Sequence, residues 1–320
     1  GIDEFRRQVE AEWDRLDKAS IDLPEAERAR IASHFAPPAL AVKPLRSEAV
    51  ARRRADDKAF DWFFRNNTTA HRVAGHRIVT IALKAPGAVP GDVTAAQMDV
   101  VADLAERYSA REVRITYTQN FVLPHVALDD LPAIYDTLVA HDLAANNAGL
   151  LTDIIACPGL DYCDLANARS IPIAQSISKL FASPERVAEI GALRLNISGC
   201  INACGHHHSG NIGILGVDKK GTEHYQITLG GSPSDDASIG TLLGPSLPAE
   251  DVPAAVEAIV DVYLAMRRDA GEDFVAFYRR VGAAPFKARV YSGSAAVTTR
   301  ALRSEEHTTE LQSRFGTSYA

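Results

Sequence analysis

The chain has 320 residues, 46% hydrophobic and 23% charged, which is ordinary soluble composition and enough for two packed domains. A formal net charge of -7 and a pI near 5.8 leave no basic stripe for a phosphate backbone, so we expect no nucleic-acid partner. No apolar run of about 18 residues could span a bilayer, and no signal pattern opens the chain. We therefore expect a cytoplasmic protein without a membrane partner.

Residues 1–66 are rich in Ala, Arg, Glu and Asp. Helical apolar spacing begins at Phe5 and Trp13 and returns at Phe60 and Phe63, which predicts helices joined by linkers. The first residue is not Met, and the first helical pattern looks like the middle of an amphipathic helix. We interpret this segment as the end of a truncated middle domain followed by a linker.

Residues 67–150 are expected to form one half-domain. The predicted elements are a strand at 76–84, a helix capped by Asp92 or Thr94, strands at 113–116 and 121–123, and a helix at 129–141. In the first of these helices, Met98, Val101, Leu104 and Ala105 should lie on one face. The order β-α-β-β-α is half of a two-layer sandwich, whose sheet needs a partner to cover or extend it.

Residues 151–291 are expected to form a second, α/β domain. Its predicted elements are a cysteine motif, a helix at 163–181, strands at 193–197, 212–217 and 224–229, and a closing helix at 252–267. The closing helix places Val256, Ile259, Val260 and Tyr263 on one side, which indicates packing against the domain.

Residues 292–320 are expected to be a disordered tail. A Ser/Gly/Ala/Thr-rich stretch precedes the segment 303–313, which resembles the translation of a common sequencing adapter except at Thr309. We interpret the tail as an artefact and give His307 no functional weight.

All four cysteines fall into two close pairs. Five residues separate Cys157 from Cys163, and three separate Cys200 from Cys204. Cytosolic thiols stay reduced, so these pairs are interpreted as metal ligands rather than disulfides. Four thiolates are the ligand set of a [4Fe–4S] cluster, with one thiolate on each iron.

Turns beside the cysteines favour the same interpretation. Gly159 and Gly199 let backbone amides approach the cluster and donate hydrogen bonds to its sulfurs. A structural zinc site remains the alternative, because the histidines at 206–208 follow the last cysteine. The five-residue gap in the first pair is longer than paired zinc ligands usually have.

The segment 198–214, taken with the first cysteine pair, resembles the signature of siroheme-dependent nitrite and sulfite reductases. The resemblance covers about residues 1–291, is nearest to assimilatory sulfite reductase hemoproteins, and points to the carboxy-terminal part of such a protein. It implies an α+β fold, in which a ferredoxin-like half-repeat (β-α-β-β-α) is followed by an α/β siroheme and [4Fe–4S] domain. The signature has an acidic residue where this chain has Asn211.

The resemblance also assigns residues to the cofactors. Cys157, Cys163, Cys200 and Cys204 would hold the [4Fe–4S] cluster, and the thiolate of Cys204 would also bridge to the siroheme iron. The segment 116–120 resembles the second of the family's two half-repeats, so Gln119 and Asn120 are expected to touch the macrocycle. Siroheme is rich in carboxylates and needs cations and amides around it; the candidates are Arg114, Asn202, His206 and Lys219.

The activity that the resemblance implies is six-electron reduction of sulfite to sulfide, with nitrite reduction to ammonia as the alternative. The electron donor would be ferredoxin or a flavoprotein subunit. We expect the substrate-binding Arg and Lys residues upstream of this chain and assign no catalytic residue within it. His206, His207 and His208 are either general acids or structural. A non-catalytic iron–sulfur electron-transfer subunit and a zinc-stabilised domain are the competing hypotheses.

Overall fold

The computed structural model describes residues 1–291 and divides the chain after Lys43 into two units. The first unit contains α1 (Ile2–Arg15), α2 (Lys18–Ile21) and α3 (Glu25–His34). The helix predicted around Phe5 is present as α1, and its apolar side chains stay exposed, Phe5 by 64% and Trp13 by 50%. The predicted tail at 292–320 lies outside the described residues. Among the described helices, none is long and apolar enough to cross a membrane.

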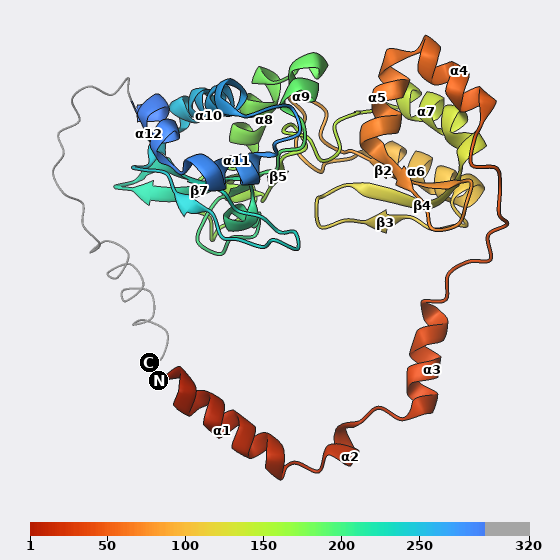
Figure 1. Cartoon of the computed structure of the whole chain (residues 1–320), viewed down its shortest axis with the longest axis horizontal. Coiled ribbons are helices and arrows are strands. Elements are labelled where there is room, and N and C mark those ends of the chain that lie inside the picture. The colour runs from red at the N-terminus through yellow and green to blue at the C-terminus, as the bar shows by residue number, and fades with distance from the viewer. Residues whose placement is uncertain (292–320) are drawn as a thin grey trace. The chain divides into compact units, whose positions relative to one another are not determined.

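The second unit begins with the half-domain, an antiparallel sheet with helices on one face (Figure 1). Its elements are α4 (Glu48–Asp56), α5 (Lys58–Asn67), β1 (Thr68–Ala70), β2 (His76–Ile81), α6 (Ala95–Tyr108), β3 (Arg114–Ile115), β4 (Phe121–Ala127) and α7 (Leu131–Ala140). The sheet order is β1-β2-β4-β3. The predicted β-α-β-β-α order is confirmed. The sequence did not predict β1, because its three residues show no alternation of apolar and polar side chains and two of them are exposed.

The core of the half-domain lies between the sheet and these helices. Phe60 and Phe63 of α5 are fully buried there with Leu123 of β4, and burying each Phe contributes about 2 kcal/mol. Thr94 caps α6 in a capping box with Gln97, as one of the two predicted caps. The buried face of α6 contains Val101, Leu104 and Ala105 as predicted. Met98, one turn before Val101, is 52% exposed and so lies outside the buried part of that face.

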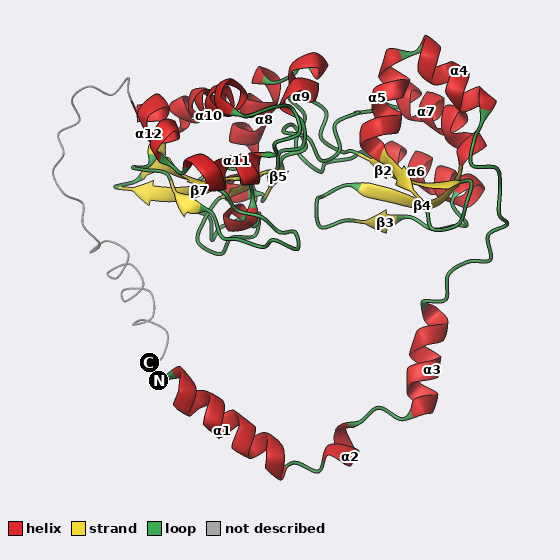
Figure 2. Ribbon diagram, viewed as in Figure 1, coloured by secondary structure: helices red, strands yellow, loops and turns green. Residues whose placement is uncertain are grey.

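The second domain is a mixed sheet covered by helices (Figure 2). Its elements are β5 (Ile155–Ala156), α8 (Ile171–Leu180), α9 (Pro184–Ile190), β6 (Leu195–Ser198), β7 (Ile212–Lys219), β8 (Thr222–Leu229), β9 (Thr241–Leu242), β10 (Leu247–Pro248), α10 (Val252–Met266), α11 (Phe274–Val281) and α12 (Ala284–Tyr291). The sheet order is β10-β8-β7-β6-β5, and β9 pairs with β8. The neighbours β5, β6 and β7 run parallel, while β8 is antiparallel to β7.

The helix predicted at 163–181 is shorter than expected. Only Ile171–Leu180 is helical, with a proline in its first turn. The preceding residues use their amides elsewhere: Cys163 donates to the Gly159 carbonyl, and Asn167 donates to the Gly199 carbonyl. This segment is therefore a loop tied to the second cysteine loop.

The buried face predicted for the closing helix is confirmed in α10, and α11 and α12 follow it.

Candidate metal centre

Both cysteine loops leave the sheet at the same edge. Strands β5 and β6 are parallel neighbours, with Ala156 opposite Ile197. The carboxyl ends of parallel neighbours lie side by side, so Cys157, directly after β5, starts beside the loop that follows β6. The Cys157 amide donates to the Ile197 carbonyl at 3.1 Å. Two cysteine pairs that are distant in the sequence therefore begin at adjoining points.

The two loops pack directly on each other. The amides of Asn167 and Ala168 donate to the Gly199 carbonyl at 2.8 and 3.0 Å. A Cβ atom added to Gly199 would lie 2.6 Å from the Ala168 carbonyl oxygen and 2.9 Å from the Gly159 Cα. Glycine is needed at position 199 because the loops leave no room there for a side chain.

The four cysteine residues differ in exposure and in the contacts of their sulfur atoms. The Gly199 amide donates to Cys157 Sγ at 3.0 Å, and Ser170 Oγ lies 3.3 Å from the same sulfur. Such hydrogen bonds to a ligand sulfur tune the potential of a bound cluster. Cys157 and Cys200 are buried, Cys163 is half-buried and Cys204 is exposed; all four are free thiols. Three of the cysteine residues are thus at least partly enclosed, and the fourth is exposed.

The number and arrangement of the candidate ligands distinguish a zinc site from an iron–sulfur cluster. Within residues 1–291, no three His, Cys, Asp or Glu side chains come close enough to share one metal ion. Zinc needs four ligands about 2–2.3 Å from a single centre, whereas a cubane distributes four thiolates over four irons. Four cysteines on two adjoining loops are the ligand set that a cluster uses.

Gln119 holds the strand that leads into the first cysteine. Its Nε2 donates to the Ala156 carbonyl at 2.7 Å, and its Oε1 accepts the Ala156 amide at 3.1 Å. Gln119 adopts a left-handed backbone with φ of 58°, in the tight turn between β3 and β4. Because Ala156 directly precedes Cys157, this paired contact helps to fix the position of the cysteine.

Asn120 belongs to a buried polar network beside that contact. Its Oδ1 accepts the Leu83 amide at 3.0 Å, and its Nδ2 donates to Asp153 at 3.1 Å. Lys84 Nζ pairs with Asp153 at 2.8 Å, and the two side chains are only 2% and 7% exposed. Lys84 also donates to the Thr118 carbonyl. The network joins the half-domain to the segment that enters β5.

The side-chain amides of Gln119 and Asn120 therefore have protein partners, and their contact with a macrocycle stays a prediction. Sequence reasoning missed Lys84 and Asp153. In the sequence, Lys84 stands at the end of a predicted strand and Asp153 stands directly before an apolar run. Charged residues at such positions are usually exposed to solvent, so the sequence gives no sign that these two are buried.

The other candidate cofactor residues lie in two settings. Asn202 and His206 are exposed on the loop that carries Cys204, and His206 has a left-handed backbone with φ of 53°. Arg114 and Lys219 are exposed at strand ends, and Arg114 is paired with Glu112. The structure brings Asn202 and His206 together with Cys204, while the roles of all four residues stay predictions.

His207 is buried, and its Nδ1 has no hydrogen-bond partner. Burial, with a smaller contribution from the neighbouring charge of His208, lowers the pKa of His207 to about 4. His207 is therefore neutral at neutral pH and carries no imidazolium proton to donate. Of the two hypotheses for these histidines, general acid or structural residue, the structural role fits His207.

Asn211 has a structural use. Its Nδ2 donates to the Gly231 carbonyl at 3.0 Å, and its Oδ1 accepts the Arg194 amide at 2.8 Å. An ionised carboxylate here would keep the second bond and lose the first, because it cannot donate. The departure from the acidic pattern is accounted for by the buried Gly231 carbonyl.

Comparison with known proteins gives two family matches. Residues 74–141 match the model described as the nitrite/sulfite reductase ferredoxin-like half domain, and residues 151–295 match the nitrite and sulphite reductase 4Fe-4S domain. The chain is 31% identical over 195 residues to the chloroplastic ferredoxin–nitrite reductase of Zea mays, covering 57% of this chain and 33% of that protein.

A second relative is a protein named sulfite reductase [ferredoxin] 2 in Mycolicibacterium paratuberculosis. It is 29% identical over 172 residues, which cover 50% of this chain and 31% of the relative. Among solved structures, the Mycobacterium tuberculosis NirA protein aligns with a TM-score of 0.59 at 23% identity, covering 69% of this chain and 41% of that one. The structural match shows a shared fold. The chain spans about a third of the length of these two curated relatives.

Proposed function

Because the chain belongs to the family of siroheme-dependent nitrite and sulfite reductases, we propose that it is the cluster-binding part of an enzyme that reduces sulfite to sulfide. Reduction of nitrite to ammonia is the second candidate. The cofactors of the family are a [4Fe–4S] cluster and siroheme. The chain spans about a third of the length of these two relatives. The reaction is therefore proposed for a longer protein that also contains the parts of the relatives that this chain does not cover.

One observation carries the proposal: two cysteine loops adjoin at the carboxyl edge of β5 and β6, with one cysteine left exposed. Cys157, Cys163 and Cys200 would each hold one iron. Cys204, which is exposed, would hold the fourth iron and also bind the siroheme. Siroheme, when bound, supplies a haem iron at which the anion can be held while six electrons arrive.

The residues of this chain would bind and orient the cofactors. Gln119 holds the residue before Cys157, and the Gly199 amide donates to the Cys157 sulfur. Arg114, Asn202, His206 and Lys219 are proposed to meet the carboxylates of siroheme, and Gln119 and Asn120 to lie against the macrocycle. The Arg and Lys residues that bind the anionic substrate are proposed to lie outside this chain.

The substrate of the proposed reaction is either sulfite or nitrite, and relatives of both kinds match this chain. The sequence resemblance favoured sulfite, whereas the maize relative is named a nitrite reductase and the mycobacterial one a sulfite reductase. Both names include ferredoxin, which supports ferredoxin over a flavoprotein subunit as the proposed donor. The proposed place of action is the cytoplasm.

The test is anaerobic reconstitution of the chain with iron, sulfide and siroheme, followed by visible spectroscopy. The proposal predicts a Soret band, a red band and the broad absorption of a cluster in one species. Cluster absorption without siroheme bands would support the non-catalytic electron-transfer alternative, and a colourless protein that retains zinc would support the zinc alternative.

A serine variant sharpens the test. Cys204→Ser should alter the siroheme bands, whereas Ser209→Ala, on the same loop, should leave them unchanged. Equal spectra for the two variants would contradict the proposed bridging role of Cys204. With reduced methyl viologen as donor, the chain alone should turn over neither sulfite nor nitrite at the rate of a full-length relative.

A further inference from the structure

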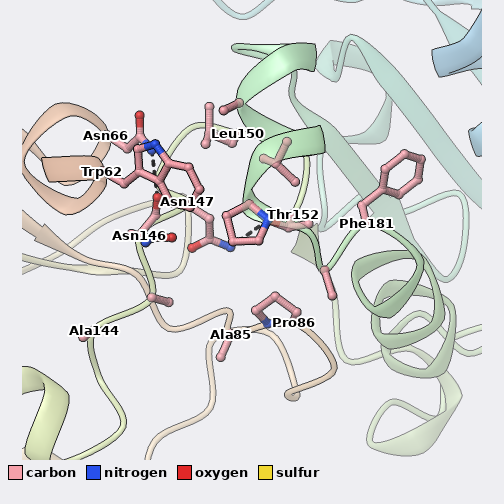
Figure 3. Close-up of a pocket in the computed structure, with 15 residues that line it drawn as sticks. Trp62, Asn66, Ala85, Pro86, Ala144, Asn146, Asn147, Leu150, Thr152 and Phe181 are labelled. Atoms are coloured by element: carbon pink, nitrogen blue, oxygen red, sulfur yellow. Dashed lines mark hydrogen bonds between the residues drawn. The ribbon is translucent and has the colours of Figure 1, made fainter. Parts of the chain in front are cut away.

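An open hollow between α5 and α9 is lined by apolar, amide and hydroxyl side chains, with Trp62 and Phe181 among them (Figure 3). Of the described residues that line it, none is acidic, basic or a cysteine. The hollow therefore offers no ligand for iron and no cation for an anionic substrate. A different feature, on strand β6, connects directly to the cysteines.

Strand β6 leads into the second cysteine loop and also contacts the far end of that loop. Asn196 and Ser198 are two residues apart on the strand, so their side chains point to the same face of the sheet. The two residues are buried, with exposed fractions of 4% and 0%. The chain leaves β6 for Cys200, turns, and returns to the strand with Gly205, directly after Cys204.

The two side chains hold the peptide groups that follow Cys204. Ser198 Oγ accepts the Gly205 amide at 3.1 Å, which fixes the peptide bond between Cys204 and Gly205. Asn196 Nδ2 donates to the Gly205 carbonyl at 3.0 Å and to the His206 carbonyl at 3.2 Å. Carbonyl oxygens only accept, so the NH₂ group of Asn196 must face them and the orientation of its amide is determined.

Gly205 lies against the strand with no room for a side chain. A Cβ atom added to Gly205 would lie 1.9 Å from the Ile197 carbonyl oxygen. The same oxygen accepts the Cys157 amide at 3.1 Å. The backbone after Cys204 therefore packs on the atom that also binds the first cysteine of the other loop, and three consecutive residues of β6 contact both cysteine loops.

The second cysteine loop has a strained backbone on both sides of this contact. Ala203 and His206 lie on either side of Gly205 in the chain, and both have left-handed backbones, with φ of 56° and 53°. Residues other than glycine keep this conformation only where the surrounding structure imposes it. The hydrogen bonds of Asn196 and Ser198 to this segment are contacts of that kind.

We propose that Asn196 and Ser198 are positioning residues for Cys204. By holding the peptide groups directly after this cysteine, they fix the place from which its thiolate binds the cluster and the siroheme. Cys157 and Cys200 are attached to the strands without these side chains, so loss of either side chain should alter the bond to siroheme more than the uptake of iron. The inference rests on the proposed function, in which Cys204 binds both cofactors.

Hydrogen–deuterium exchange of the cofactor-free chain tests the contact itself. Ser198→Ala should speed exchange of the Gly205 amide about fivefold, the order expected when one hydrogen bond is lost. Ser198→Thr keeps the hydroxyl group and should restore the parent rate. The matched control is Ser109, which is also 0% exposed and whose Oγ accepts the His125 amide at 3.2 Å in the half-domain. Ser109→Ala should leave exchange at Gly205 unchanged, and an unchanged rate in Ser198→Ala would overturn the assignment.

Visible spectroscopy of the anaerobically reconstituted chain tests the effect on the cofactors. At equal iron content, Ser198→Ala and Asn196→Leu should shift the siroheme bands in the direction in which Cys204→Ser shifts them, while Ser109→Ala should not. Siroheme bands identical to those of the parent in both variants would overturn the inference and leave the proposed function intact. A parent chain that takes up no cluster or no siroheme would instead contradict the proposed function, and this inference with it.

Discussion

Replacing Lys84 by Met should destabilise the folded chain strongly. Lys84 Nζ lies 2.8 Å from Asp153 Oδ1, and the two side chains are 2% and 7% exposed. Removing one partner of such a pair leaves a buried charge and typically costs about 3–5 kcal/mol. Asp153 would retain hydrogen bonds from the Gly149 amide and from Asn120 Nδ2. We therefore expect the lower end, about 3 kcal/mol.

An identical substitution elsewhere provides the control. Lys58 pairs with Glu185 at 3.0 Å, but the two side chains are 67% and 64% exposed. An ion pair this exposed contributes about 0–1 kcal/mol, so Lys58→Met should change the unfolding free energy little. Urea unfolding followed by circular dichroism measures both variants. Unfolding free energies for Lys84→Met and Lys58→Met within about 0.5 kcal/mol of each other would refute the claim that the buried network holds the junction.

Three further predictions follow from single contacts. Gln119→Leu removes both hydrogen bonds to Ala156 and should lower the amount of iron that the chain retains after reconstitution. The control Gln8→Leu, on the exposed helix α1, should leave the iron content unchanged. Equal iron contents in the two variants would show that the contact does not position Cys157. Asn211→Asp should cost about 1–3 kcal/mol at pH 7, because the Gly231 carbonyl loses its donor; a melting temperature equal to that of the parent would exclude this. Since the pKa of His207 is about 4 in the folded chain, against an ordinary value of 6.5, the unfolded chain binds the proton first as the pH falls. Stability should be highest above pH 6.5 and should decline by about 3 kcal/mol as the pH falls to 4. His207→Gln should remove this decline, and a pH profile identical to that of the parent would contradict it.

The sequence predicted the elements best where the apolar period was regular. The strand at 76–84, the helix capped by Thr94 and the buried side of α10 all have clear patterns and were found. The helix predicted across Cys163 was too long, because loop residues such as Asn167 bond to Gly199, about 30 residues further along the chain. Such a long-range partner leaves no local period in the sequence.

In the candidate site, too, local features could be predicted from the sequence and long-range contacts could not. Spacing and residue type predicted the cysteines as metal ligands, which stays a prediction, and a glycine turn at Gly199. The crowding of Gly199 against Ala168 appears only in the structure. The buried pair of Lys84 and Asp153 was missed, because burial of a charge depends on residues 69 positions apart meeting in the fold. The second hydrogen bond of Asn211 likewise depends on Gly231, which no local pattern connects to it.

Iron and sulfide analysis with EPR spectroscopy of the anaerobically reconstituted, reduced chain tests the central claim most directly. A single cluster held by all four cysteines predicts about four irons and four sulfides per chain and one EPR signal, which Cys157→Ala and Cys200→Ala each abolish. About one metal ion per chain, or a full iron content in either alanine variant, would contradict a shared [4Fe–4S] centre.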